Sequence, residues 1–138
     1  MRVAAVQVAT GFDPEENRRL VADRLDAAAH DGATVVVFPE ATMVTFGDAA
    51  FDLSFVAETL DGPFVSLLAE RAGRHGITVV AGMFERTTEP EADGHVRRVF
   101  NTVVVVGPAG LLGAYRKLHL FDALGARESD KVRPGDPS

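Results

Sequence analysis

A glutamate directly after a buried strand is the first residue of this sequence that could do chemistry. Residues 34–38 show no polar alternation, which predicts a strand buried on both faces of its sheet. Pro39 cannot donate a ladder hydrogen bond, so Glu40 follows at the carboxyl end of the strand, where open α/β sheets bind ligands. A partly desolvated carboxylate there could act as a general base, whereas the alternative is a solvated glutamate in an ordinary loop.

A lysine in a short basic segment is the second candidate. If residues 115–121 alternate as in a strand, Lys117, His119 and Phe121 share one face. A lysine that faces inward at a strand end can stabilise a developing oxyanion, and the alternative is a lysine on a solvated edge. We expect His119 to be a hydrogen-bonded structural histidine, and the spacing of the four histidines predicts no metal site.

Composition restricts the class of protein. The 138 residues suffice for one domain, and 46% hydrophobic with 25% charged residues is typical of a globular protein. A net charge of −6 makes nucleic acid an unexpected partner, and no apolar run approaches the ~20 residues that span a bilayer. The N-terminus lacks a signal-peptide layout, so we expect a cytoplasmic protein. The absence of cysteine excludes a cysteine nucleophile within these residues.

Hydrophobic periodicity, helix caps and turn residues predict two helices and five strands. The helices are expected at 14–30 and 63–75, and the strands at 2–8, 34–38, 77–84, 97–106 and 111–115.

Three stretches are expected to lack regular structure. Residues 41–60 should be a loop that lines a pocket, with Phe46, Phe51 and Phe55 as apolar anchors, although these rings could simply pin the loop to the core. Residues 87–95 should be an exposed polar connection, and 125–138 a polar tail without a core-forming pattern. Glu128 lies in this tail, where charged residues are usually solvated.

The order and spacing of several motifs resemble the nitrilase or carbon–nitrogen hydrolase family along the whole chain. The motifs are Gln7, Phe38-Pro39-Glu40, Gly62-Pro63, Ala81-Gly82, Asn101-Thr102, residues 115–121, Glu128-Ser129 and Pro134-Gly135. The resemblance implies an α/β fold, the α-β-β-α sandwich. It also implies hydrolysis of a non-peptide carbon–nitrogen bond in a small amide, carbamoyl compound or nitrile.

The resemblance also implies a catalytic set of a glutamate base, a lysine, a cysteine nucleophile and a supporting glutamate. Glu40 matches the base, and Lys117 matches the lysine that stabilises the tetrahedral intermediate. Glu128 matches the supporting glutamate, after a loop of variable length. No metal or organic cofactor is implied, and the complete protein is expected to be a homo-oligomer, a dimer or larger. The tips of Glu40 and Lys117 should lie within hydrogen-bonding or one-water reach.

The sequence departs from the family pattern because the family's cysteine follows the Pro-Gly segment and family members are longer. We therefore expect residues 1–138 to be the N-terminal half of a single hydrolase domain, inactive alone and prone to association. Two alternatives stay open. One is a non-catalytic truncated remnant that at most binds a small ligand or partner. The other is an unrelated hydrolase that uses Glu40 and Glu128 as an acid–base pair.

Overall fold

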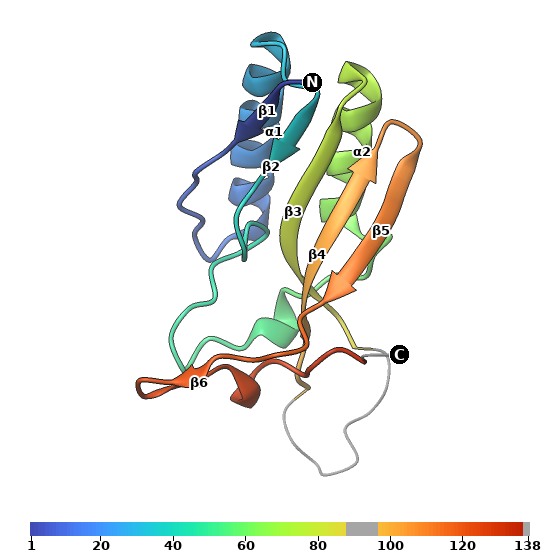
Figure 1. Ribbon diagram of the computed structural model, residues 1–138. Helices are drawn as coiled ribbons and strands as arrows, with labels where there is room; N and C mark the ends of the chain where they lie inside the picture. Colours follow the sequence, from blue (N-terminus) through green and yellow to red (C-terminus); the bar gives the residue numbers. More distant parts are fainter. Residues whose placement is uncertain (88–96, 137–138) are drawn as a thin grey trace.

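The computed structural model describes residues 1–87 and 97–136, which place five strands in one sheet with two helices against one face (Figure 1). The strands are β1 (Val3–Ala5), β2 (Val35–Val37), β3 (Thr78–Glu85), β4 (Phe100–Gly107) and β5 (Gly110–Arg116). They are ordered β1-β2-β3-β4-β5, with β1, β2 and β3 parallel and β4 antiparallel to both β3 and β5. The predicted α/β class and all five predicted strands are confirmed, with shifted ends.

The two helices begin and end where the sequence predicts, because local signals mark their ends: a capping aspartate before α1, and a proline at the start and a glycine after the end of α2. Helix α1 spans Pro14–His30, and the Asp13 Oδ1 accepts the backbone N–H groups of Glu15 and Glu16 at 2.8 and 3.4 Å. Helix α2 spans Pro63–His75 and ends at Gly76, whose φ of 65° is left-handed. No helix in the described residues is both long and apolar enough to cross a membrane.

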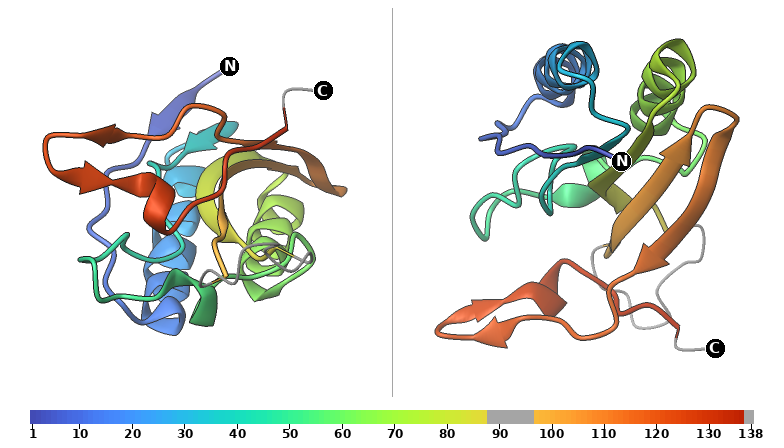
Figure 2. Two further views of the ribbon diagram at one scale, coloured as in Figure 1. Left: turned by 90° about the horizontal axis from the view of Figure 1, so that it is seen from below. Right: turned by 45° about the horizontal axis from the view of Figure 1, so that its top comes forward.

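The two faces of the sheet differ in their cover. On β2, β3 and β4 the face toward the helices is buried and contains Val36, Val79, Ala81, Val104 and Val106. On the other face, Val35 and Val37 of β2 are half-buried, and Tyr115 of β5 is 56% exposed. Both views in Figure 2 show α1 and α2 on the same side of the sheet. The expected burial of residues 34–38 on both faces is therefore wrong for the described residues, because no second layer covers this face.

The connection after Glu40 is more structured than expected. It contains the short 3₁₀ helix η1 (Leu53–Phe55). Phe46 packs edge-on against Phe84 and Phe51 against Phe12, with ring centroids 5.7 and 4.8 Å apart. Phe55 is 84% exposed, so the prediction that it anchors the loop is wrong. The polar connection predicted at 87–95 lies, from residue 88 onward, outside the described residues.

The segment after β5 is not a featureless tail. Strands β6 (Asp122–Ala123) and β7 (Ala126–Arg127) form a hairpin, followed by the 3₁₀ helix η2 (Glu128–Asp130). Val132 is fully buried and forms a parallel bridge to Val99. The prediction of a tail without core residues is wrong here, because a single valine between polar neighbours gives no periodic signal.

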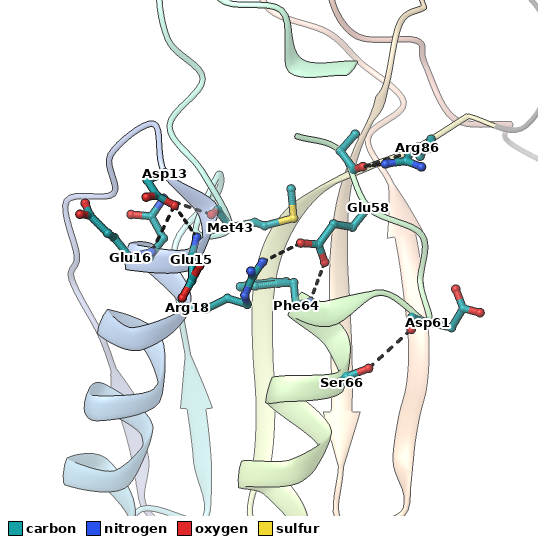
Figure 3. Close-up of polar contacts among 12 residues, drawn as sticks. Asp13, Glu15, Glu16, Arg18, Met43, Glu58, Asp61, Phe64, Ser66 and Arg86 are labelled. Atoms are coloured by element: carbon teal, nitrogen blue, oxygen red, sulfur yellow. Dashed lines mark hydrogen bonds and ion pairs between the residues drawn. The ribbon is translucent and has the colours of Figure 1, made fainter. Parts of the chain in front are cut away.

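One glutamate ties the two helices together. The Glu58 Oε2 accepts the backbone N–H of Phe64 in the first turn of α2 at 2.6 Å, and its Oε1 accepts Arg18 Nη1 from α1 at 2.9 Å (Figure 3). A carboxylate at a helix N-terminus is favoured by the helix dipole. The Glu58 carboxylate therefore links α1 to the first turn of α2.

Candidate active site

The turn that carries Glu40 is held close against β3. Gly82 makes this approach possible, because a Cβ there would lie 2.9 Å from the Glu40 Cα and from the Pro39 O. Thr42 Oγ1 donates to the Pro39 carbonyl at 2.6 Å. Ala41 has a φ of 55°, a left-handed conformation that costs a residue with a side chain about 1–2 kcal/mol. The backbone therefore presents Glu40 from a tight turn held by its neighbours.

Lys117 continues the line of β5 beyond its last paired residue. Its N–H donates to the Asn101 carbonyl of β4 at 2.8 Å, and its carbonyl accepts the Gly135 N–H at 2.9 Å. The lysine backbone is thus fixed between β4 and the C-terminal segment. Because successive strand residues face opposite sides, Asn101 and Lys117 point to the face that the helices leave open.

Glu128 comes from a later segment of the chain and lies at the same site as Glu40 and Lys117. The β6–β7 hairpin reverses the chain so that Glu128 returns to Phe121. The Phe121 N–H donates to Glu128 Oε2 at 2.7 Å, and the Phe121 carbonyl accepts the Glu128 N–H at 3.2 Å. Leu124 and Gly125, with φ of 54° and 84°, supply the two left-handed residues of the tight turn between the strands.

The three predicted site residues meet in one cluster. Lys117 Nζ lies 3.0 Å from Glu40 Oε1, 2.9 Å from Glu128 Oε2 and 3.2 Å from Glu128 Oε1. The predicted approach of the Glu40 and Lys117 tips is confirmed. The expectation that Glu128 is a solvated loop residue is wrong, because its side chain is 7% exposed. The alternative of a lysine on a solvated edge is likewise excluded for Lys117, which is paired with both carboxylates.

A fourth residue, Asn101, belongs to the cluster and was not assigned a role from the sequence. Its Nδ2 donates to Glu40 Oε1 at 2.6 Å and to Glu128 Oε1 at 3.0 Å. Asn101 is buried, next to the valine run 103–106 of β4. A polar side chain beside such an apolar run is the signal that could have identified it, because buried amides need hydrogen-bond partners.

The electrostatics of the cluster keep Lys117 and Glu128 charged. Partial burial disfavours the Lys117 ammonium, but the hydrogen bonds to Glu128 and Glu40 outweigh it, so the pKa of Lys117 is raised. Burial likewise disfavours the Glu128 carboxylate. The Phe121 N–H, Asn101 and Lys117 together outweigh that penalty, so the pKa of Glu128 is lowered. Glu128 therefore serves as a fixed anion and is a poor proton acceptor near neutrality.

Glu40 has a different environment from Glu128. Its side chain is 62% exposed, so the expected partial desolvation is wrong for the described residues, where nothing covers the tip of the turn. Both of its hydrogen bonds, from Lys117 and Asn101, go to Oε1. In the described part of the chain, Oε2 has no donor. Glu40 therefore keeps one oxygen available to a reacting group.

Glu40, Lys117 and Glu128 lie on the wall of a cavity of about 850 Å³. Residues of the 46–54 connection, of the β6–β7 hairpin and of the segment after it form the rest of the wall. Lys131 binds this connection through the carbonyls of Phe46, at 3.3 Å, and Asp48. Burial lowers the pKa of Lys131, against the opposing effect of Asp48 and Asp52. The connection predicted to line a pocket does so.

Two further predictions concern histidine and metals. His119 is exposed and has no hydrogen bond within the described residues, so its predicted structural role is wrong. Residues 1–87 and 97–136 contain no group of three or more histidine, aspartate or glutamate side chains arranged to hold a metal ion.

The fold and the sequence place this chain in a known family. The model of the carbon-nitrogen hydrolase family matches residues 2–137, so the chain belongs to that family. A structure from Xanthomonas campestris, described as a CN-hydrolase superfamily protein with an arsenic adduct in its active site, superposes with a TM-score of 0.80. It is 28% identical, and the match covers 99% of this chain and 46% of the other.

Two curated relatives are similar over nearly the whole chain. A hydrolase from Mycobacterium tuberculosis is 44% identical over 138 residues, which cover 98% of this chain and 46% of the relative. An omega-amidase from Danio rerio is 34% identical over 140 residues, which cover 97% of this chain and 47% of the relative. The chain thus spans about half the length of the curated relatives it matches.

Proposed function

We propose that the complete protein hydrolyses a non-peptide carbon–nitrogen bond of a small amide, carbamoyl compound or nitrile through a cysteine thioester. By "complete protein" we mean the longest natural product that contains residues 1–138. We also propose that these residues are the N-terminal part of one hydrolase domain, and that they are inactive alone. The observation that carries the proposal is the Lys117 ammonium between two carboxylates, of which only Glu40 has an oxygen without a donor among the described residues.

In the proposed reaction, Glu40 accepts the proton of a cysteine thiol that residues 1–138 do not contain. The thiolate attacks the substrate carbon, and the Lys117 ammonium stabilises the negative charge that develops on the substrate oxygen or nitrogen. For an amide, Glu40 returns its proton to the departing amine, the carbon–nitrogen bond breaks and a thioester remains. Glu40 next takes a proton from water, which attacks the thioester, and returns it to the sulfur as the acid is released.

Glu128 has a supporting role in this proposal. It receives donors from Lys117, Asn101 and the Phe121 N–H, and its lowered pKa keeps it ionised through the cycle. A fixed anion beside Lys117 keeps the ammonium in place while Glu40 changes its protonation state. Because its lowered pKa keeps Glu128 ionised, it would be a poor general acid, which argues against the alternative in which the two glutamates form an acid–base pair.

The test is an assay of ammonia release from a panel of small amides by the complete protein. We expect activity in the wild type and its loss in Glu40→Gln, because the amide cannot accept the thiol proton. Glu70→Gln is the matched control, since Glu70 is an exposed glutamate on α2, outside the cluster. Full activity in Glu40→Gln would contradict the proposed base.

The alternative of a non-catalytic remnant remains an outcome of the same assay. It is favoured by the absence of cysteine from residues 1–138. A wild-type protein that binds small amides in the cavity but releases no ammonia would support it. Homo-oligomeric assembly and a cytoplasmic location also remain predictions, to be checked by analytical ultracentrifugation and by fractionation of the source cells.

A further inference from the structure

We propose that Asn101 is a positioning residue that holds both carboxylates around Lys117 and directs the free oxygen of Glu40 toward the reacting groups. This inference deepens the proposed function and rests on it for the catalytic role of Glu40. Its structural basis is a single amide group that contacts both glutamates, and a backbone carbonyl of the same residue that accepts the Lys117 N–H.

The orientation of the Asn101 amide follows from chemistry alone. Its terminal group lies 2.6 Å from Glu40 Oε1 and 3.0 Å from Glu128 Oε1. An ionised carboxylate only accepts hydrogen bonds, so the group that faces both oxygens must be the NH₂ and not the carbonyl. The two hydrogens of one NH₂ therefore serve one carboxylate each. Without them, Lys117 would be the one side-chain donor that the described residues offer to Glu40.

The consequence for Glu40 is that its two oxygens become inequivalent. Oε1 is occupied by Asn101 and Lys117, and Oε2 has no donor among residues 1–87 and 97–136. Lys117 alone could pair with either oxygen, since a flexible ammonium is a point charge without directional preference. The rigid amide on a strand is what selects Oε1. The proton taken from the thiol then goes to Oε2, and the same oxygen returns it to the departing amine.

Asn101 also acts on Glu128, which gives a readout that does not need catalysis. Burial alone would raise the pKa of Glu128. The hydrogen bond from Asn101 is one of the interactions that outweigh burial and lower this pKa. Removal of the amide should therefore raise the pKa of Glu128, whether or not the protein turns over any amide. A residue that only fills space would produce no such change.

The experiment compares Asn101→Asp, Asn101→Ala and Asn101→Ser in the complete protein. Asn101→Asp keeps the shape of the side chain and replaces the donor by an acceptor. We expect kcat to fall by about 100-fold, as for other displacements of a catalytic group, with KM little changed. Asn101→Ser keeps a shorter donor, so we expect it to retain more activity than Asn101→Ala. If Asn101→Asp does not fold, the comparison of Asn101→Ser with Asn101→Ala still tests whether a hydrogen-bond donor is needed at this position.

Asn17 provides the matched control. It is also a buried asparagine, and its Nδ2 donates to the carbonyls of Gly11 and Met43 at 2.9 and 3.2 Å, outside the cluster. Asn17→Asp should lower stability without the loss in kcat per folded molecule. An Asn101→Asp variant with wild-type kcat, or with a loss no larger than that of Asn17→Asp, would overturn the proposal.

A carbon-13 NMR titration of the Glu128 carboxyl separates this inference from the proposed function. We expect its midpoint to move to higher pH in Asn101→Ala and to stay unchanged in Asn17→Ala. If the wild type releases no ammonia, the proposed function fails, while the titration still decides whether Asn101 holds Glu128. An unchanged Glu128 midpoint in Asn101→Ala would overturn the role of Asn101 at this carboxylate.

Discussion

Two neighbouring cations, Arg116 and Lys117, each meet a buried glutamate, but on opposite faces of the same strand end. Arg116 pairs with Glu85 through two nitrogens, with the Nε 2.9 Å from Glu85 Oε2, and its guanidinium lies 4.3 Å from the centre of the Phe100 ring. The hydrogen bonds that Arg116 donates to Glu85 raise the pKa of Arg116. Both oxygens of Glu85 are occupied, so this pair is closed in the sense that its carboxylate has no oxygen left to offer a ligand.

The pair that Lys117 makes is open by comparison. Its ammonium is shared between Glu128 and Glu40, and it borders the cavity. Two adjacent residues of β4 show the same contrast. Thr102 donates to Glu85 on the closed side, and Asn101 donates to Glu40 and Glu128 on the open side. Strand alternation thus separates a structural ion pair from the proposed catalytic cluster by a single residue. We infer that the closed pair fixes the strand end on which the open cluster depends.

The largest expected effect is at Lys117. Lys117→Met in the complete protein should lower kcat by about 100- to 1000-fold, because it removes the charge that we propose stabilises the developing anion. Arg116→Met is the matched control, and it should keep most of the activity per folded molecule. Steady-state amide hydrolysis with active-site titration measures both. Equal losses in the two variants would break the distinction between the open and the closed pair.

The second expected effect is on the free energy of unfolding, where Arg116→Met should have the larger effect and Lys117→Met the smaller one. Arg116→Met should lower the free energy of unfolding by about 1–3 kcal/mol, because it leaves the buried Glu85 without its main partner. The lower part of the range is expected, since the Arg116 side chain is 44% exposed and solvent screens the pair. Urea denaturation followed by circular dichroism gives the value. A change in Lys117→Met larger than in Arg116→Met would contradict the assignment of the structural role to Arg116.

The third effect is smaller and sharpens the comparison within β4. Thr102→Val keeps the β-branched shape and removes one hydrogen bond, 2.9 Å long, to Glu85 Oε2. We expect a loss of about 1 kcal/mol in stability and an unchanged kcat, in contrast to the loss of kcat in Asn101→Asp. Thermal unfolding and the amide assay test the pair of variants. A loss of kcat in Thr102→Val at full folding would show that the two faces are coupled.

The smallest expected effect is a pH dependence at Glu128, because burial cancels part of what its donors contribute. The pKa of Glu128 is lower in the folded protein than the ordinary value of 4.5. Its contribution to stability is therefore present above pH 4.5 and is lost as the pH falls through the folded pKa. Glu128→Gln should show a shallower loss of stability on acidification than the wild type or Glu70→Gln. Identical acid slopes in urea denaturation would contradict it.

The sequence contained most of the fold but only part of the site. The helices 14–30 and 63–75 were predictable because their caps and glycine stops are local signals, which need no knowledge of tertiary contacts. Glu40 was predictable as a candidate because a proline ends its strand in the sequence itself. The strand ends were less predictable, since residues 6–8 continue the apolar pattern beyond β1 without entering it.

The rest of the site depends on contacts between distant segments. The burial of Glu128 requires the β6–β7 hairpin, whose strands of two residues each are too short for a periodic pattern. The role of Asn101 requires both glutamates to be placed first. The resemblance to a family could assign Glu128 by position, but it could not show that one amide holds both carboxylates. Residue types indicated the charges of the site, and packing determined which of them meet.

The glycine beneath the Glu40 turn has a consequence for how this chemistry could be lost over evolutionary time. Any side chain at position 82 would collide with the backbone at Pro39 and Glu40. A single missense change there would displace Glu40, the proposed base, while the codons for Glu40, Lys117 and Glu128 all stayed in the gene. A sequence comparison that checks only these charged positions would then classify an inactive protein as an active one. Position 82 is therefore a marker for telling working descendants of this fold from inert ones.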